Sequence, residues 1–265
     1  ERSEDGTAYA AMAEGTRLVG GLISGKLKLE WVKAELVCDD PAKGLGSIPR
    51  RKLLVTGLTR ALSDTSRTLD AATAYFVPGR IGANFLRRMA RSGRQIRVLT
   101  NSLASTDVAP VHAGYARYRR RLLRAGVRLF EMKPQHDTRE PAGGMKERKF
   151  PRLGSSRSSL HAKLFLVDRE KLFIGSFNFD PRSVYLNCEM GILLSSASIG
   201  EQVGRQFDRL AADASFEPRL GRLGKLHWLD GSSGAMAAEQ VEPQSTWRQR
   251  LLAGVISWLP VEWML

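Results

Sequence analysis

Apolar residues recur along positions 51–213 with two different periods, and these periods predict helices and strands in turn. Apolar positions three or four residues apart indicate a helix, whereas short apolar runs between turn residues indicate buried strands. Pro78, Gly93 and Gly126 mark the ends of such segments. We predict helices over 51–68, 81–93, 114–126 and 197–213, and strands over 69–78, 95–101, 127–132, 159–168, 171–178 and 187–194.

The alternation of strands and helices predicts an α/β fold. Strands that follow one another through helices form parallel βαβ units, so we expect an α/β/α sandwich with a mixed, largely parallel sheet. In such a fold the functional loops gather at the carboxyl ends of the strands.

The lobe over 51–215 is flanked by less regular segments. Residues 1–50 form a lead-in that begins with an Ala-rich helix and ends in a Pro- and Gly-containing loop. Residues 133–158 lack any periodicity, and connections of that length are usually functional or disordered. Residues 216–265 form a C-terminal extension that is irregular until a short helix from Trp247, broken at Pro260. We expect this extension, with Trp258 and Trp263, to pack on the lobe or on a membrane surface.

Charge changes the picture more than overall hydrophobicity does. Lys and Arg outnumber Asp and Glu by 41 to 27, a formal net charge of +14, so the partners should be anionic lipid headgroups or nucleic acid. An Arg-rich helix presents either a solvated face or such a binding site, through Arg117, Arg119, Arg120, Arg121 and Arg124.

The two cysteines, Cys38 and Cys188, lie far apart and match neither a disulfide framework nor a zinc site, which favours a reducing compartment. The sequence contains no apolar run of about 20 residues of the kind that spans a bilayer, so we expect any membrane contact to be peripheral.

The candidate chemistry lies in one run with the pattern H-x-K-x4-D-x6-G-S-x-N, formed by His161, Lys163, Asp168, Gly175, Ser176 and Asn178. Side chains alternate along a strand, so His161 and Lys163 should point to the same side and address one phosphate. Leu160, Ala162 and Leu164 should point the other way. The alternative is a core histidine and a solvated lysine on a half-buried strand.

Gly175, Ser176 and Asn178 end the next predicted strand, where a hydroxyl and an amide can donate to the same phosphate oxygens as the lysine. Positive charge and oriented donors around a phosphoryl group stabilise its transition state. A single histidine does not complete phosphodiester exchange through a covalent intermediate, because one imidazole must attack phosphorus while another acid protonates the leaving alkoxide. We find neither a second copy of the motif nor a cluster of metal ligands, and we expect no cofactor.

The motif resembles the HKD motif of the phospholipase D superfamily. The resemblance implies two motifs facing each other across a pseudo-twofold axis, one histidine becoming phosphohistidine and the other acting as acid and base, with lysines in place of magnesium. By position His161 is the candidate for the acid-base role, although the sequence leaves both roles open. The resemblance also implies that Glu189 orients an imidazole, and that Asp168 is structural and ties down neighbouring backbone.

Further stretches resemble the C-terminal half of bacterial cardiolipin synthases of the C-type subgroup, namely those at 39–44, 74–79, 98–123 and 258–265. The resemblance implies transfer of a phosphatidyl group to phosphatidylglycerol, with phosphatidylethanolamine as the suggested donor, by a peripheral protein on the cytoplasmic side of the bacterial inner membrane. It places Asn101, Ser102, Asp107 and His112 in the loop after a strand, as substrate-lining candidates.

These enzymes are about twice as long and carry two motifs. The chain is therefore expected to be the second half of a larger protein, inactive or nearly so alone, or to pair two copies of His161 in a homodimer. The alternatives are a dimeric HKD endonuclease that uses the basic surface for nucleic acid, and a non-catalytic lobe that presents a basic face to a membrane or nucleic acid.

Overall fold

The computed structural model describes residues 20–21, 24–26, 29–46, 48–134, 160–231 and 241–257. The chain divides into two compact units, Glu1–Lys33 and Ala34–Leu265. In the first unit the described residues include a helical turn that ends where Lys26 N donates to Gly21 O at 2.9 Å. The second unit carries the motif. The predicted loop 133–158 lies outside the described residues except at its first two positions, as do Trp258, Trp263 and Pro260.

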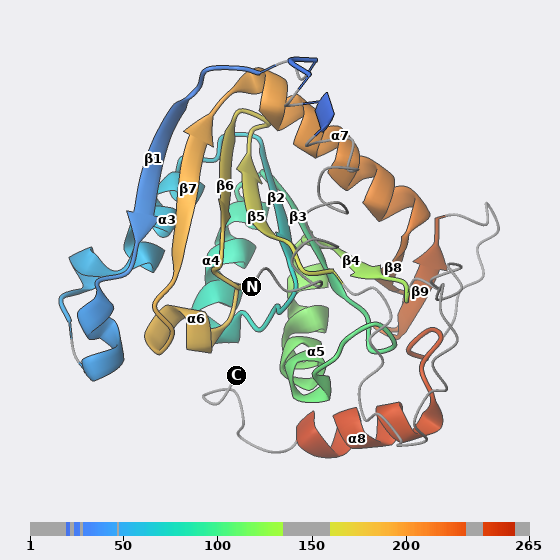
Figure 1. The fold of residues 1–265 in the computed structure, drawn as a ribbon. Helices are drawn as coiled ribbons and strands as arrows, with labels where there is room; N and C mark the ends of the chain where they lie inside the picture. Colours follow the sequence, from blue (N-terminus) through green and yellow to red (C-terminus); the bar gives the residue numbers. More distant parts are fainter. Residues whose placement is uncertain are drawn as a thin grey trace, which may run out of the picture. The chain divides into compact units, whose positions relative to one another are not determined.

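The second unit is built on one nine-stranded sheet in the order β1-β7-β6-β5-β2-β3-β4-β8-β9 (Figure 1). The strands are β1 (Lys33–Cys38), β2 (Thr68–Thr73), β3 (Gln95–Asn101), β4 (Arg128–Met132), β5 (Lys163–Val167), β6 (Lys171–Gly175), β7 (Met190–Ser195), β8 (Ser215–Leu220) and β9 (Leu226–Asp230).

The sheet is mixed, as predicted, but the expectation that it is largely parallel is wrong. The pairs β2–β3 and β3–β4 are parallel. The pairs β2–β5, β5–β6, β6–β7, β4–β8 and β8–β9 are antiparallel. The reason is the length of the connections: helices link the first strands, whereas the turn between Val167 and Lys171 is too short for a crossover and makes β5–β6 a hairpin.

Helices cover both faces of the sheet. They are α3 (Leu54–Ser63), α4 (Gly79–Arg91), α5 (Ala109–Leu123), α6 (Pro181–Tyr185), α7 (Ala197–Asp213) and α8 (Trp247–Ser257), with 3-10 turns η1 (Pro41–Leu45) and η2 (Arg50–Lys52). On one face α3, α4 and α5 pack on a core that includes Leu69, Val98 and Phe165. On the other face Phe207 and Ala211 of α7 pack on a second cluster. This arrangement is the predicted α/β/α sandwich.

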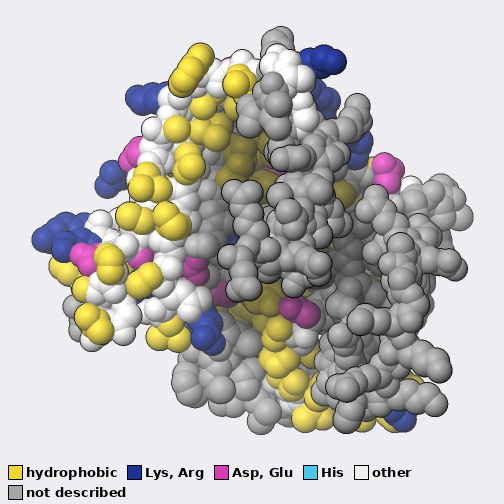
Figure 2. Space-filling view, in the orientation of Figure 1, with side chains coloured by type: hydrophobic (Ala, Val, Ile, Leu, Met, Phe, Trp, Pro, Cys, Tyr) yellow, Lys and Arg dark blue, Asp and Glu magenta, His cyan; other side chains and the backbone are white. Residues whose placement is uncertain are grey.

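Part of the second face carries exposed apolar side chains. Alternation along β1, β7 and β6 places Leu36, Ile192 and Ile174 on the face of α7, because their neighbours Val37, Leu193 and Phe173 pack on the opposite side. Leu36 is 62% exposed, Ile192 47% and Ile174 49%. Figure 2 shows hydrophobic side chains gathered over these three strands. We call this surface, Leu36, Ile174 and Ile192, the apolar sheet face.

Three strands lie in segments that the sequence indicated to be loop or irregular. Strand β1 falls within the predicted lead-in, and β8 and β9 fall within the predicted C-terminal extension. The described part of the extension also packs on the lobe, because Ala253 and Ile256 of α8 contact Leu103 and Ala113. The sheet therefore extends past both flanks of the lobe predicted at 51–215.

Candidate active site

The His-x-Lys pair lies where β5 begins. Lys163 is the first residue of β5 and pairs with Thr73 of β2, and Ala74 N donates to Ala162 O at 3.0 Å, so the extended pairing continues toward His161. His161 is exposed and Lys163 is half-buried, with its Nζ 3.2 Å from the His161 carbonyl oxygen, to which it donates. Both side chains are accessible to a ligand.

The residues that alternate with His161 and Lys163 face away from them, as the alternation predicted. Leu160, Ala162 and Leu164 all pack against the cluster beneath α7. His161 and Lys163 have the opposite parity, which they share with Phe165. The motif therefore has an apolar side facing α7 and a chemical side facing the other way.

Asn101 holds the residue that precedes His161. Its buried side chain donates from Nδ2 to Ala74 O at 3.2 Å and to Leu160 O at 3.1 Å, and its Oδ1 accepts from Leu160 N at 2.9 Å. An amide that pairs with both backbone groups of one residue fixes that residue against the end of β3. Asn101 was predicted to line the substrate site, and here its hydrogen bonds go to the backbone that positions His161.

The other three substrate-lining candidates lie in different surroundings. Ser102 is buried and donates to Ser105 Oγ at 3.1 Å in the turn after β3. Asp107 is exposed and accepts from Tyr75 Oη at 3.1 Å. His112 is buried within α5, where it contacts Glu242. Of the four candidates Asp107 is exposed, whereas Asn101, Ser102 and His112 are buried. Contact between any of them and a substrate stays a prediction.

Tyr75 connects Asp107 with the end of the motif. Tyr75 N lies 3.4 Å from Asn178 Oδ1, to which it donates, and Phe179 N donates to Thr73 Oγ1 at 3.2 Å. Burial, with the nearby Asp107 carboxylate, raises the pKa of Tyr75 to about 12. The phenol therefore stays protonated and remains a hydrogen-bond donor just beyond the carboxyl end of β2.

Glu189 is the buried carboxylate of the site. It accepts a hydrogen bond from Ser176 Oγ and another from Ser183 Oγ at 3.0 Å, so its two oxygens hold both serines. Its own backbone N donates to Asp39 Oδ2 at 2.9 Å, and Lys43 Nζ donates to the same Asp39 oxygen at 2.7 Å. We call this set, Asp39, Lys43, Ser176, Ser183 and Glu189, the carboxylate network.

The carboxylate network joins segments that are about 150 positions apart in sequence, and the sequence analysis did not anticipate it. Asp39 and Lys43 are both buried and form an ion pair at 2.7 Å. Lys43 Nζ also donates to Ser183 O at 2.8 Å. Buried charges need this kind of pairing, and the pairing fixes Glu189 beside the motif serine.

Asp168 is a backbone anchor. It adopts a left-handed conformation with φ 52° and accepts hydrogen bonds from Ser66 N, Arg67 N and Thr68 N, each at 2.8 Å. Partial burial opposes its charge, but hydrogen bonds from Thr68 and Ser66 outweigh burial and lower the pKa of Asp168 to about 2. The carboxylate ties the start of β2 to the turn that follows β5.

The Arg-rich helix α5 is not simply a solvated face. Arg119 is 4% exposed and lies between Glu131, at 2.8 Å, and Glu242, at 2.5 Å. Although burial opposes ionisation, Arg119 and His112 hold the pKa of Glu242 well below its usual range. Arg117 donates to Ser257 O. These cations join α5 to β4 and to the C-terminal segment.

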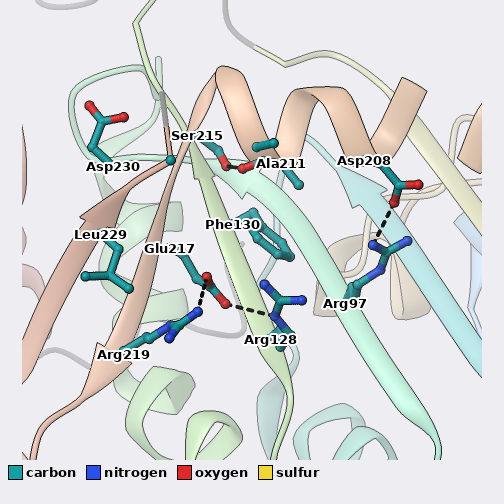
Figure 3. Close-up of a pocket in the computed structure, with 12 residues that line it drawn as sticks. Arg97, Arg128, Phe130, Asp208, Ala211, Ser215, Glu217, Arg219, Leu229 and Asp230 are labelled. Atoms are coloured by element: carbon teal, nitrogen blue, oxygen red, sulfur yellow. Dashed lines mark hydrogen bonds and ion pairs between the residues drawn. The ribbon is translucent and has the colours of Figure 1, made fainter. Parts of the chain in front are cut away.

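A separate cavity of about 400 Å³ lies between α7 and strands β3, β4, β8 and β9, away from the motif (Figure 3). Its arginines are paired with carboxylates: Arg97 with Asp208 at 2.7 Å, and both Arg128 and Arg219 with Glu217, at 2.8 and 2.9 Å. Because each of these guanidinium groups already contacts a carboxylate, this cavity is a weaker anion site than the motif.

Within the described ranges, no group of His, Cys, Asp and Glu side chains is arranged to hold a metal ion. The same described residues include no helix that is both long and apolar enough to cross a bilayer.

The fold and motif define a phospholipase D-like protein, and comparisons with known proteins agree. The family described as "Cardiolipin synthase, PLD-like domain" matches residues 58–211. The chain belongs to this family. Its fold resembles that of phosphatidylserine synthase from Haemophilus influenzae Rd KW20, with a TM-score of 0.54, 15% sequence identity and coverage of 90% of this chain and 49% of that one.

Among curated proteins, cardiolipin synthase C of Escherichia coli (strain K12) is 42% identical over 257 residues, which cover 97% of this chain and 53% of the relative. Cardiolipin synthase B of the same strain is 23% identical over 201 residues, 76% of this chain and 41% of the relative. The predicted resemblance to C-type cardiolipin synthases is confirmed. The chain spans about half the length of these relatives.

Proposed function

We propose that this chain supplies one of two HKD half-sites of a phosphatidyltransferase that forms cardiolipin from phosphatidylglycerol and a second phospholipid. The observation that supports the proposal most is the accessible His161–Lys163 pair at the start of β5, in a chain of the cardiolipin synthase family. Lipid transfer is favoured over nucleic-acid cleavage because the curated relatives described above are cardiolipin synthases.

The proposed reaction has two steps. The imidazole of one half-site attacks phosphorus of the donor lipid, and an N–P bond forms as the P–O bond to the headgroup alcohol breaks. The imidazole of the other half-site protonates the leaving alkoxide. It then removes the proton from the primary hydroxyl of phosphatidylglycerol, whose oxygen attacks phosphorus as the N–P bond breaks. We assign His161 the acid-base role.

Lys163, Ser176 and Asn178 would donate to the phosphoryl oxygens and stabilise their charge. Glu189 would accept a hydrogen bond from the imidazole of the other half-site and fix its tautomer. The carboxylate network supports this role because it holds the carboxylate of Glu189 beside Ser176. Asn101, Ser102, Asp107 and His112 remain candidates for the walls of the lipid site.

The second half-site would come from the same parent chain or from a second copy. We propose that the apolar sheet face is covered by that second half, since contiguous exposed apolar surface usually marks an interface. Mixing this chain with a separately expressed partner half should restore transfer. Ile192→Asp should prevent restoration, while Leu223→Asp, at an exposed position on the loop between β8 and β9, should not.

We propose that the protein works at the cytoplasmic side of the bacterial inner membrane as a peripheral protein. Its net charge of +14 would hold it at anionic leaflets.

The test is lipid transfer by the parent protein. Incubation with phosphatidylglycerol and phosphatidylethanolamine, followed by lipid separation, should give cardiolipin. His161→Ala or Lys163→Ala should lower the rate by a factor on the order of 100 to 10,000, whereas His227→Ala, on β9, should leave it unchanged. Full activity in His161→Ala would remove the catalytic assignment. Salt-sensitive DNA cleavage without lipid product would favour an endonuclease instead.

A further inference from the structure

A groove of about 800 Å³ lies on the face of the sheet that α3 and α4 cover. Its walls are largely apolar and include Leu58 and Leu62 of α3, Phe85 of α4, and Val184 of α6. The volume is within the range of sites that bind small molecules, and the apolar lining is typical of them.

The rim of the groove is basic. Arg80 and Arg88, eight residues or about two turns apart on α4, both line it, and Ile81 beside Arg80 is 75% exposed. Among the described residues, no carboxylate lies within ion-pair distance of either guanidinium. Asp180 also lines the groove, but its Oδ1 accepts from Ser183 N at 2.7 Å and caps α6. The two arginines therefore leave uncompensated positive charge at an apolar opening.

The groove backs onto the motif. Phe177 and Phe179 line it, and they alternate with Ser176 and Asn178, whose side chains bond elsewhere, to Glu189 and to the Tyr75 backbone. The ring of Phe179 lies against α4 where Gly82 leaves room, since a Cβ added at Gly82 would be 2.6 Å from the ring. One segment therefore separates the proposed chemistry from the groove.

We propose that this groove binds an acyl chain of an anionic glycerophospholipid, with the lipid phosphate held by Arg80 and Arg88. A flexible hydrocarbon chain matches the apolar walls, and a guanidinium group matches a phosphate in charge and geometry. No bond is broken at this site. His161, Lys163, Ser176 and Asn178 are not among the residues that line the groove, so it is distinct from the proposed site of transfer, and it would seat the protein on a lipid leaflet.

The experiment is a calorimetric titration of the 265-residue chain with dihexanoyl phosphatidylglycerol below its micelle concentration. Thr59 is exposed and lines the groove, so Thr59→Trp should fill it and weaken binding at least tenfold. Ser198→Trp, at an exposed position of α7 on the opposite face, is the matched control and should bind like the wild type. Each of Arg80→Ala and Arg88→Ala should weaken binding about fivefold.

Glycerol 3-phosphate tests the headgroup alone and should bind at least tenfold more weakly than the lipid. Wild-type affinity in Thr59→Trp, or equal affinity for glycerol 3-phosphate, would overturn the proposal. Lys163→Ala separates the two sites. If it alone abolishes binding, the lipid occupies the motif and the groove proposal fails. If binding survives Lys163→Ala but the parent makes no cardiolipin, the groove stands and the proposed function fails.

Discussion

The Asp168 anchor offers a quantitative test of how the motif is held. Its carboxylate accepts three backbone hydrogen bonds from 66–68 and one from Ser66 Oγ at 2.7 Å. Asp168→Asn is the appropriate change, because asparagine tolerates the left-handed conformation at φ 52° but removes the charge and one acceptor oxygen. The variant should fold, with less stability.

The magnitude follows from the pKa of Asp168, which falls from 3.8 to about 2 in the folded protein. At about 1.4 kcal/mol per unit the shift corresponds to roughly 2.4 kcal/mol, and solvent screening of this partly exposed group reduces it to about 1 kcal/mol. Poorly satisfied backbone donors add on the order of 1 kcal/mol. We expect Asp168→Asn to lower the free energy of unfolding by about 1 to 3 kcal/mol at pH 7.

Because the folded-state pKa of Asp168 is depressed, its contribution is fully present above about pH 4 and is lost as the pH falls toward 2. Urea unfolding of wild type and variant at pH 7 and at pH 3 should therefore show a smaller difference at pH 3. Glu170→Gln in the same turn, an exposed ion pair with Arg67 at 3.6 Å, is the control and should change little. If Asp168→Asn left the stability unchanged but abolished transfer, Asp168 would take part in the reaction and would not serve as a backbone anchor.

Three other changes test separate parts of the fold. Gly82→Ala places a Cβ 2.6 Å from Phe179 and should cost about 1 to 3 kcal/mol in thermal unfolding, and a variant as stable as wild type would show that the ring moves freely. Asp107→Asn should lower the midpoint of the Tyr75 phenol titration from about 12. The titration is followed by ultraviolet absorbance, with Tyr75→Phe as the blank. An unchanged midpoint would show that the Asp107 carboxylate does not influence the phenol. Arg119→Met removes the guanidinium that pairs with both Glu131 and Glu242 and should cost about 3 to 5 kcal/mol in urea unfolding, far more than loss of an exposed arginine of α5. A loss as small as that of the exposed arginine would contradict the buried pairing.

The sequence predicted the regular part of the fold closely. Helix α7 and strand β3 have the predicted bounds, 197–213 and 95–101, because an amphipathic period or an apolar run stands between clear turn residues. Strands β1 and β8 were missed for physical reasons. Strand β1 has charged residues at Lys33 and Glu35, and β8 contains Pro218, a residue that normally argues against a strand.

In the candidate site, too, some residues could be predicted from the sequence and others could not. His161 and Lys163 could be found because they belong to a pattern of six positions with fixed gaps, and because residues two apart on a strand share a face. The ion pair of Asp39 and Lys43 could not, because its role depends on Glu189, far along the chain. Sequence separation hides such contacts, and only the fold brings them together.

The structure also changes what the basic composition means. Lys43, Arg97, Arg119 and Arg128 all pair with carboxylates, so these cations stabilise the fold and add little to the attraction of an anionic partner. Charge that remains uncompensated is therefore more informative than the net charge of +14. Helix α4 has such charge: it contains basic residues and no acidic residue, and it borders the apolar groove. A combination of cations and apolar surface fits a phospholipid better than nucleic acid, whose backbone would use the cations and leave the groove unfilled.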